Sequence, residues 1–195
     1  MKIQLPEGDF AAFIFDCDGT LADTMPLHYK AWRSALKKHN AEFPEALFYE
    51  LGGVPTDKIV EILNERHGHS MPVKETATFK DELFIKLIPQ TLPIEPVVEL
   101  VHKFHGVKPL AVASGGTREI VRKILTALKI LDKFQVVITT EDYARGKPAP
   151  DPFLEAARRL GVAPEKCLVF EDTAAGIAAA KSAGMQWVYI PAPKR

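Results

Sequence analysis

Acidic residues that could bind a cation occur in two short segments of the sequence. Asp16 and Asp18 lie in the string DCDGT, and Glu171 and Asp172 end the run CLVFED. Clustered carboxylates repel one another unless a cation neutralises them, and their hard oxygen atoms select Mg²⁺. The two segments together therefore predict a magnesium site.

Two further segments carry groups that suit a phosphate ester. Ser114 in SGG offers a hydroxyl donor, and Lys147 in GKP offers a compact positive charge. Gly115, next to the serine, lets the backbone approach a phosphate closely. A carboxylate held beside Mg²⁺ and a lysine stays ionised, so Asp16 can attack phosphorus as a nucleophile. Asp18, two residues later, can protonate the leaving alcohol and then activate water.

Short apolar runs lead into most of these residues and predict the strands of one sheet. The runs are continuous and flanked by turn residues, as is typical of strands buried on both faces of a parallel sheet. They are residues 10–16, 108–114, 134–141, 167–172 and 185–190. Amphipathic helical stretches at 117–130, 151–160 and 173–183 separate the last four runs. Because strand and helix alternate, the expected fold class is α/β, with a doubly wound and mostly parallel sheet.

The carboxyl ends of the strands are where open α/β sheets bind ligands. DCDGT, SGG and the Glu171-Asp172 pair each follow a different strand, and Lys147 lies in the loop after a third strand in the chain. By itself, each string could be structural, as a turn after a strand or as the acidic start of a helix. Their joint placement at one edge of the sheet favours a catalytic site.

The region between the first two runs breaks the alternation. It contains helical patterns only, at residues 26–38, 44–51, 56–67 and 73–88, and a crossover needs far fewer residues. We therefore expect a small α-helical domain, residues 24–92, inserted into a core domain of residues 1–23 and 93–195. The proline-rich segment 89–96 is expected to be the return linker. Trp32 is expected to pack inside the insert.

The bulk composition excludes several classes of partner. Lys plus Arg and Asp plus Glu both number 25, so the zero formal charge gives no electrostatic case for nucleic acid or for an anionic membrane. Cys17 and Cys167 lie in apolar runs, where burial without a disulfide is expected. The chain has no apolar run of about 20 residues and begins without a signal-peptide pattern. We expect a cytoplasmic protein that acts as a monomer on a small molecule.

The strings DCDGT, Ser114, Lys147 with Pro148, and the Glu171-Asp172 pair resemble, in order, the four motifs of the haloacid-dehalogenase superfamily of phosphotransferases. The resemblance covers nearly the whole chain. The stretches DCDGTLADTMPLHYKAW and VFEDTAAGIAAAKSAGM look like the β-phosphoglucomutase-like branch, and in particular its small fructose-1-phosphate and other sugar-phosphate phosphatases. The helical insert looks like the small α-helical cap that this superfamily adds to its Rossmann-like core.

The resemblance implies a phosphatase that hydrolyses a small phosphate ester, such as fructose 1-phosphate, through an aspartyl-phosphate on Asp16. It implies that Mg²⁺ is bound by the side chains of Asp16, Glu171 and Asp172 and by the backbone carbonyl of Asp18. The residues implied to hold the phosphate are Ser114, Gly115 and Lys147. The cap residues expected to contact the substrate are Thr24, His28 and Gly53.

Two alternatives of other classes stay open at this point. A phospho-receiver domain also combines a doubly wound sheet with an acidic cluster, a hydroxyl residue and a lysine. Asp18 opposes this alternative because it would speed the loss of the phosphate, and the helical insert has no use in a receiver. A catalytically inactive binding protein is disfavoured because every expected catalytic residue is present.

The mutase is the alternative within the same branch. A β-phosphoglucomutase must hold a second phosphate with cationic side chains of its cap and of the loop after the second strand. Where the mutase has a lysine and an arginine in its cap, this chain has glycine and Thr56, and Thr117 replaces a further lysine. Losing these cations favours hydrolysis. Three nearby residues could substitute for them: Lys58, Lys74 and Arg118.

Overall fold

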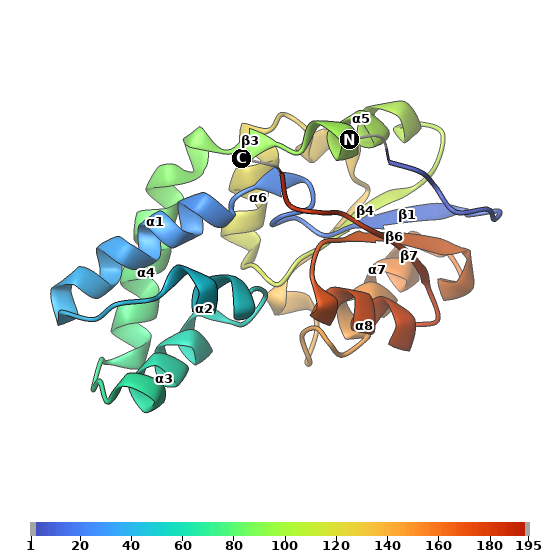
Figure 1. Cartoon of the computed structure of the whole chain (residues 1–195). Coiled ribbons are helices and arrows are strands. Elements are labelled where there is room, and N and C mark those ends of the chain that lie inside the picture. The colour runs from blue at the N-terminus through green and yellow to red at the C-terminus, as the bar shows by residue number, and fades with distance from the viewer. Residues whose placement is uncertain (1–2, 194–195) are drawn as a thin grey trace. The chain divides into compact units, whose positions relative to one another are not determined.

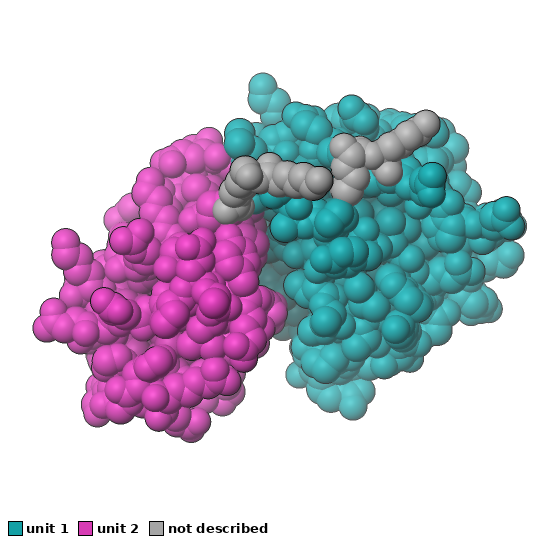
Figure 2. All heavy atoms as spheres, viewed as in Figure 1, with its two compact units in different colours: residues 1–23, 92–195 teal, residues 24–91 magenta. Residues whose placement is uncertain are grey.

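The computed structural model describes residues 3–193. The chain forms two compact units: residues up to 23 join those from 92 onward in one unit, and residues 24–91 form the other (Figure 2). The chain thus leaves the first unit after residue 23 and returns to it at residue 92. The expected roles of these parts as catalytic core and substrate cap stay predictions.

A parallel sheet of five strands lies at the centre of the larger unit, within the residues described. Its strands follow the order β5-β4-β1-β6-β7, and every neighbouring pair is parallel. Their bounds are β1 Ala12–Phe15, β4 Leu110–Ala113, β5 Val136–Ile138, β6 Cys167–Glu171 and β7 Gln186–Tyr189. Every residue of β1, β4 and β6 is buried, which explains their nearly unbroken apolar sequences. The predicted α/β fold with a doubly wound sheet is confirmed.

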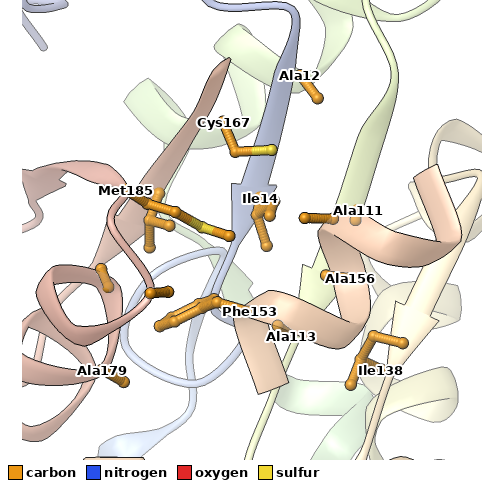
Figure 3. Packing of buried hydrophobic residues seen from close by; sticks show 14 residues of the cluster. Ala12, Ile14, Ala111, Ala113, Ile138, Phe153, Ala156, Cys167, Ala179 and Met185 are labelled. Carbon is orange, nitrogen blue, oxygen red and sulfur yellow. The ribbon is translucent and has the colours of Figure 1, made fainter. Parts of the chain in front are cut away.

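Helices cover both faces of this sheet (Figure 1). Their bounds are α5 Glu95–Phe104, α6 Arg118–Ala127, α7 Asp151–Leu160 and α8 Ala174–Ser182. On one face, Ile14 of β1 belongs to a buried cluster with Phe153 of α7 and Ala179 of α8 (Figure 3). On the other face, the ring of Phe13 meets Phe104 of α5 edge to face at 4.8 Å. Successive residues of β1 therefore anchor helices on opposite faces.

The smaller unit, all of whose residues are described, is helical. Its α-helices are α1 Met25–Leu36, α2 Glu45–Glu50, α3 Thr56–His67 and α4 Val73–Leu87. Trp32 of α1 is buried, and its ring meets Phe43 edge to face at 5.6 Å. Phe48 of α2 and Leu63 of α3 belong to the same apolar cluster. The predicted place of Trp32 in the core of the insert is confirmed.

Short elements account for the differences from the expected segments. The 3₁₀-helices are η1 Lys37–His39, η2 Ile88–Gln90, η3 Leu131–Lys133, η4 Thr140–Asp142 and η5 Pro164–Lys166. The strand β2 Ala22–Asp23 pairs antiparallel with β3 Leu92–Pro93. The segment 89–96, expected to be the return linker, spans the point at which the chain re-enters the first unit, and it also contains the end of η2, all of β3 and the start of α5. Pro96 fits there because the first turn of a helix needs no N–H from it.

The expected strand at 134–141 is wrong in its last part. Only Val136–Ile138 is strand, and Thr140–Asp142 turn into the 3₁₀-helix η4. The carboxylate of Asp142 accepts hydrogen bonds from the N–H and the hydroxyl of Thr139, at 3.0 and 2.9 Å. Such a local side-chain bond competes with strand pairing.

Two expectations from composition can be compared with the structure. Cys17 and Cys167 are buried and form no disulfide, as expected. None of the helices within residues 3–193 combines the length and the apolar character needed to cross a lipid bilayer.

Replacing Phe153 tests how much the packing of α7 against the sheet contributes to the stability of the protein. Phe153→Ala should lower the free energy of unfolding by about 3–5 kcal/mol, because it opens a cavity among fully buried groups. The measurement is equilibrium unfolding in urea. The matched control is the neighbouring Leu154→Ala, whose side chain is 38% exposed and whose loss should cost less than about 1 kcal/mol. Equal losses for the two variants would contradict this account of the core.

Candidate active site

Three neighbouring strands end at one edge of the sheet and carry most of the candidate residues. Asp16 directly follows β1, Ser114 follows β4, and Glu171 ends β6 with Asp172 next in the chain. Because β4, β1 and β6 are adjacent and parallel, their carboxyl ends lie side by side. This is the edge at which doubly wound sheets bind ligands.

Lys147 joins the acidic cluster from the loop before α7. Its ammonium donates hydrogen bonds to Asp16 Oδ1 at 2.6 Å and to Glu171 Oε2 at 2.7 Å, and its side chain is only 10% exposed. Burial acts to lower the pKa of Lys147, but the two carboxylates more than offset this and raise the pKa above its ordinary value. The lysine is therefore a fixed positive charge at the strand ends.

The negative charge of the carboxylates in this cluster exceeds the positive charge that Lys147 supplies. Burial raises the pKa of Asp16 well above its ordinary value; Lys147 opposes this rise, and the neighbouring carboxylates add to it. Burial and the charge of Glu171 likewise raise the pKa of Asp172 to about 7. One ammonium thus serves three carboxylates, and a bound cation would remove the excess negative charge.

The donor atoms fit a divalent cation that prefers oxygen. Asp16, Glu171 and Asp172 each offer one ligand atom, and these three atoms lie within 4.8 Å of one another. Both oxygens of Glu171 already accept hydrogen bonds, Oε2 from Lys147 and Oε1 from the Thr173 hydroxyl at 2.7 Å. Direct metal binding by Glu171 would compete with these bonds, and its place in the ligand set stays a prediction.

The side chains of Asp18 and Ser114 both lie close to Gly116. A Cβ atom built on Gly116 would lie 3.9 Å from Asp18 Oδ2 and 3.4 Å from Ser114 Oγ. Ser114 Oγ accepts a hydrogen bond from Gly116 N at 3.0 Å, and its hydroxyl keeps one hydrogen to donate. Gly115, which lies between Ser114 and Gly116 in the chain, is exposed. The structure thus places the acid/base candidate next to the phosphate-binding candidates.

Three residues that orient the carboxylates were missed by the sequence analysis. The Thr20 hydroxyl donates to Asp172 Oδ1 at 3.0 Å. The backbone N–H of Thr173 donates to Glu171 Oε1 at 3.0 Å, next to the bond from its hydroxyl. Gly176 must lack a side chain, because a Cβ atom would lie 2.0 Å from Glu171 Cδ. The available signal was Thr173, because a threonine just before a helix is a typical N-cap, and here its side chain accepts from Gly176 N.

The predicted substrate contacts Thr24, His28 and Gly53 belong to the helical unit. Thr24 is buried at the N-terminus of α1, and Gly53 is exposed with a φ of +82°. The ring of His28 stacks on Phe84 with 3.6 Å between centroids, and its Nδ1 lies 2.9 Å from the ammonium of Lys80. The sequence analysis gave no role to Lys80, a buried lysine. The roles of the three predicted residues stay predictions.

A parallel sheet with acidic groups, a lysine and a serine at its carboxyl edge is typical of α/β proteins that bind a ligand at the ends of their strands. Comparison with known proteins agrees with this class. Residues 10–184 match the family of haloacid dehalogenase-like hydrolases, and the chain belongs to this family. It is therefore a hydrolase, which contradicts the receiver-domain and inactive-protein alternatives.

Individual members of the family are similar to this chain over most of its length. Fructose-1-phosphate phosphatase YqaB of Escherichia coli is 36% identical over 181 residues, which cover 93% of this chain and 96% of that protein. The phosphorylated carbohydrates phosphatase of Thermotoga maritima is 32% identical, with 91% of this chain and 83% of that protein covered. The crystal structure of β-phosphoglucomutase from Clostridium difficile superposes with a TM-score of 0.80 at 28% identity, covering 91% of this chain and 83% of that one.

Replacing Asp172 tests the charge imbalance directly. Metal-free Asp172→Asn should unfold at a higher temperature than the wild type at pH 8, by about 2–4 °C for each kcal/mol of repulsion removed. The pKa of Asp172, about 7 against an ordinary 3.8, means that ionisation of this group lowers the stability of the folded state progressively between these two pH values and by its full amount above about pH 7. The gain should therefore fade as the pH falls below 7. Thermal unfolding followed by circular dichroism measures it.

The same variant should respond less to added metal. Mg²⁺ should raise the unfolding temperature of the wild type and raise that of Asp172→Asn much less. The control is Asp9→Asn, because the Asp9 side chain is 92% exposed. A lower unfolding temperature for metal-free Asp172→Asn at pH 8 would contradict the electrostatic account.

Proposed function

We propose that the protein is a Mg²⁺-dependent phosphatase that hydrolyses a small sugar phosphate, with fructose 1-phosphate as the first candidate. The observation that carries this proposal is the buried contact of Asp16 with Lys147 at 2.6 Å, beside two further carboxylates. A carboxylate beside an ammonium and a cation site can act as a nucleophile toward a dianionic phosphoryl group, which would otherwise be repelled. The sugar-phosphate class is supported by the two phosphatase relatives.

The side chains around Asp16 divide the task of holding the phosphoryl group. The Lys147 ammonium supplies charge-assisted hydrogen bonds, and the Ser114 hydroxyl supplies a neutral one. The exposed backbone at Gly115 can approach the same oxygens, because no side chain blocks it. Mg²⁺ held by Asp16, Asp172 and the backbone carbonyl of Asp18, with or without Glu171, supplies further positive charge when bound.

The reaction proceeds in two displacements at phosphorus. An Asp16 carboxylate oxygen forms a bond to phosphorus while the ester P–O bond breaks, and Asp18 gives its proton to the departing alkoxide. A water oxygen then forms a bond to the phosphorus of the aspartyl-phosphate while the bond to Asp16 breaks. Asp18 takes a proton from this water. Inorganic phosphate leaves, and both residues return to their starting states.

The contacts of two possible substitute cations favour hydrolysis over the mutase reaction. Arg118 donates to Asp142 at 3.0 Å, and Lys58 pairs with Glu61 at 2.7 Å. Both side chains thus form ion pairs with carboxylates. A second phosphate of a bisphosphate would have to compete with these carboxylates for the positive charge. The two phosphatase relatives, at 36% and 32% identity, support the same choice. A monomeric state, like the substrate itself, stays a prediction.

Replacing the nucleophile should abolish turnover. Asp16→Asn should lower kcat/KM for a phosphate ester by at least about 10³-fold, because an amide neither attacks phosphorus nor offers charge to a cation. Release of inorganic phosphate measures it, and circular dichroism checks the fold. Asp9→Asn is the matched control and should keep wild-type activity. Turnover of Asp16→Asn within about tenfold of wild type would remove Asp16 from this role.

A substrate screen separates hydrolase from mutase. With Mg²⁺ present, we expect phosphate release from hexose and triose phosphates, with kcat/KM for fructose 1-phosphate at least about tenfold above that for nucleoside monophosphates. Two assays run in parallel on β-glucose 1-phosphate, one for inorganic phosphate and one for glucose 6-phosphate. Faster appearance of glucose 6-phosphate than of phosphate would establish the mutase instead.

A further inference from the structure

Tyr143 touches the site, yet no motif predicted it and the proposed reaction does not use it. It follows η4, four residues before Lys147, and is half-buried. Its hydroxyl donates a hydrogen bond to the backbone oxygen of Ser114 at 3.1 Å, across 29 residues of sequence. This bond joins the loop that carries Lys147 to the strand end that carries Ser114.

The bond from Tyr143 completes the fixation of Ser114. The backbone N–H of Ser114 donates to the carbonyl oxygen of Ile138 at 3.0 Å, and its Oγ accepts from Gly116 N at 3.0 Å. With Tyr143 bonded to its carbonyl, three polar atoms of one serine are held by three partners: Ile138, Tyr143 and, in the serine's own loop, Gly116. The serine hydroxyl is thereby aimed, while its hydrogen stays available for a substrate oxygen.

The ring of Tyr143 reaches the lysine loop as well. A Cβ atom built on Gly146 would lie 3.7 Å from Tyr143 Cε2, which is ordinary contact distance. Burial raises the pKa of the Tyr143 phenol, and the charges of Lys147 and Asp16 also act on it, so the side chain lies within their field. One side chain therefore contacts the backbone of Ser114 and lies next to Gly146, the residue before Lys147.

The backbone before Tyr143 is itself anchored, so the tyrosine can act as a spacer. Asp142 Oδ1 accepts hydrogen bonds from Arg118 at 3.0 Å and from Arg159 at 2.8 Å. Although burial acts to raise it, the bonds from Arg159 and Thr139 lower the pKa of Asp142, so the carboxylate stays charged at neutral pH. The neighbouring Glu141 accepts from Arg118 N at 2.9 Å, at the start of α6. These bonds fix residues 139–143 against the loop that follows Ser114.

We propose that Tyr143 is a positioning residue that sets the separation between the Ser114 hydroxyl and the Lys147 ammonium for one phosphoryl group. The inference rests on the proposed phosphatase function and adds a specific contact to it. Two donors bind one dianion well only at a matched spacing, and a displacement of about 1 Å can reduce turnover by about 10²-fold. Without the tyrosine hydroxyl, the Ser114 carbonyl loses its link to the lysine loop.

Tyr143→Phe tests this role, because it keeps the ring against Gly146 and removes only the hydroxyl. We expect kcat/KM for the best phosphate ester to fall about tenfold, mainly through KM, since both donors act on the bound phosphate. The dissociation constant of inorganic phosphate, measured by isothermal titration calorimetry at saturating Mg²⁺, should rise by a similar factor. The stabilisation by Mg²⁺ alone should match wild type, because the carboxylates are untouched.

The matched control is Tyr189→Phe, which removes a hydroxyl from a tyrosine that is 57% exposed at the end of β7. All assays are run well below the unfolding temperature of each variant. Tyr143→Phe with wild-type kcat/KM and phosphate affinity, whether or not it is less stable, would overturn the inference and leave the proposed function intact. Equal losses in Tyr189→Phe would also overturn it. If the wild type neither binds nor releases phosphate, the proposed function and the inference fail together.

Discussion

The surrounding structure depends on one buried interaction, the contact of the Lys147 ammonium with the carboxylates of Asp16 and Glu171. Removing charged groups from water costs several kcal/mol per ion, and only close, fully hydrogen-bonded partners offset it. The distances of 2.6 and 2.7 Å meet that condition, and Thr173 satisfies the other oxygen of Glu171. Gly176 leaves room for that carboxylate. Losing one partner would leave an uncompensated buried charge, so these residues depend on one another.

Stability and function oppose each other at this edge of the sheet. Three carboxylates share one ammonium, and the raised pKa values of Asp16 and Asp172 show that their charged forms are disfavoured. A site of this kind gains stability from a bound cation, and the combined positive charge then suits a phosphate ester. The destabilising cluster is held in place by apolar packing elsewhere, around Ile14 and Phe153 on one face and Phe13 on the other.

The main elements of the sheet unit could be predicted because burial leaves a local pattern in the sequence. β1, β4 and β6 coincide with apolar runs, and α7 and α8 coincide with helical periodicity. Two of the elements that were not predicted are too short to show a period. β2 and β3 have two residues each, and their pairing joins Ala22 to Pro93, far apart in the chain. α5 was hidden because its first turn contains Pro96, which suggested a linker, although proline is compatible with the start of a helix.

The sequence by itself determined which chemical groups are available and that they gather at one edge of the sheet. Asp16 and Ser114 each end an apolar run, and parallel strands in one sheet must end on the same side. Only the tertiary structure decided the partner of each group: Thr20 bonds to Asp172, and Tyr143 bonds to Ser114. The first of these pairs is separated by 152 residues. A hydrogen bond tolerates only a few tenths of an ångström, and that accuracy comes from the packing of the whole sheet rather than from any spacing along the chain.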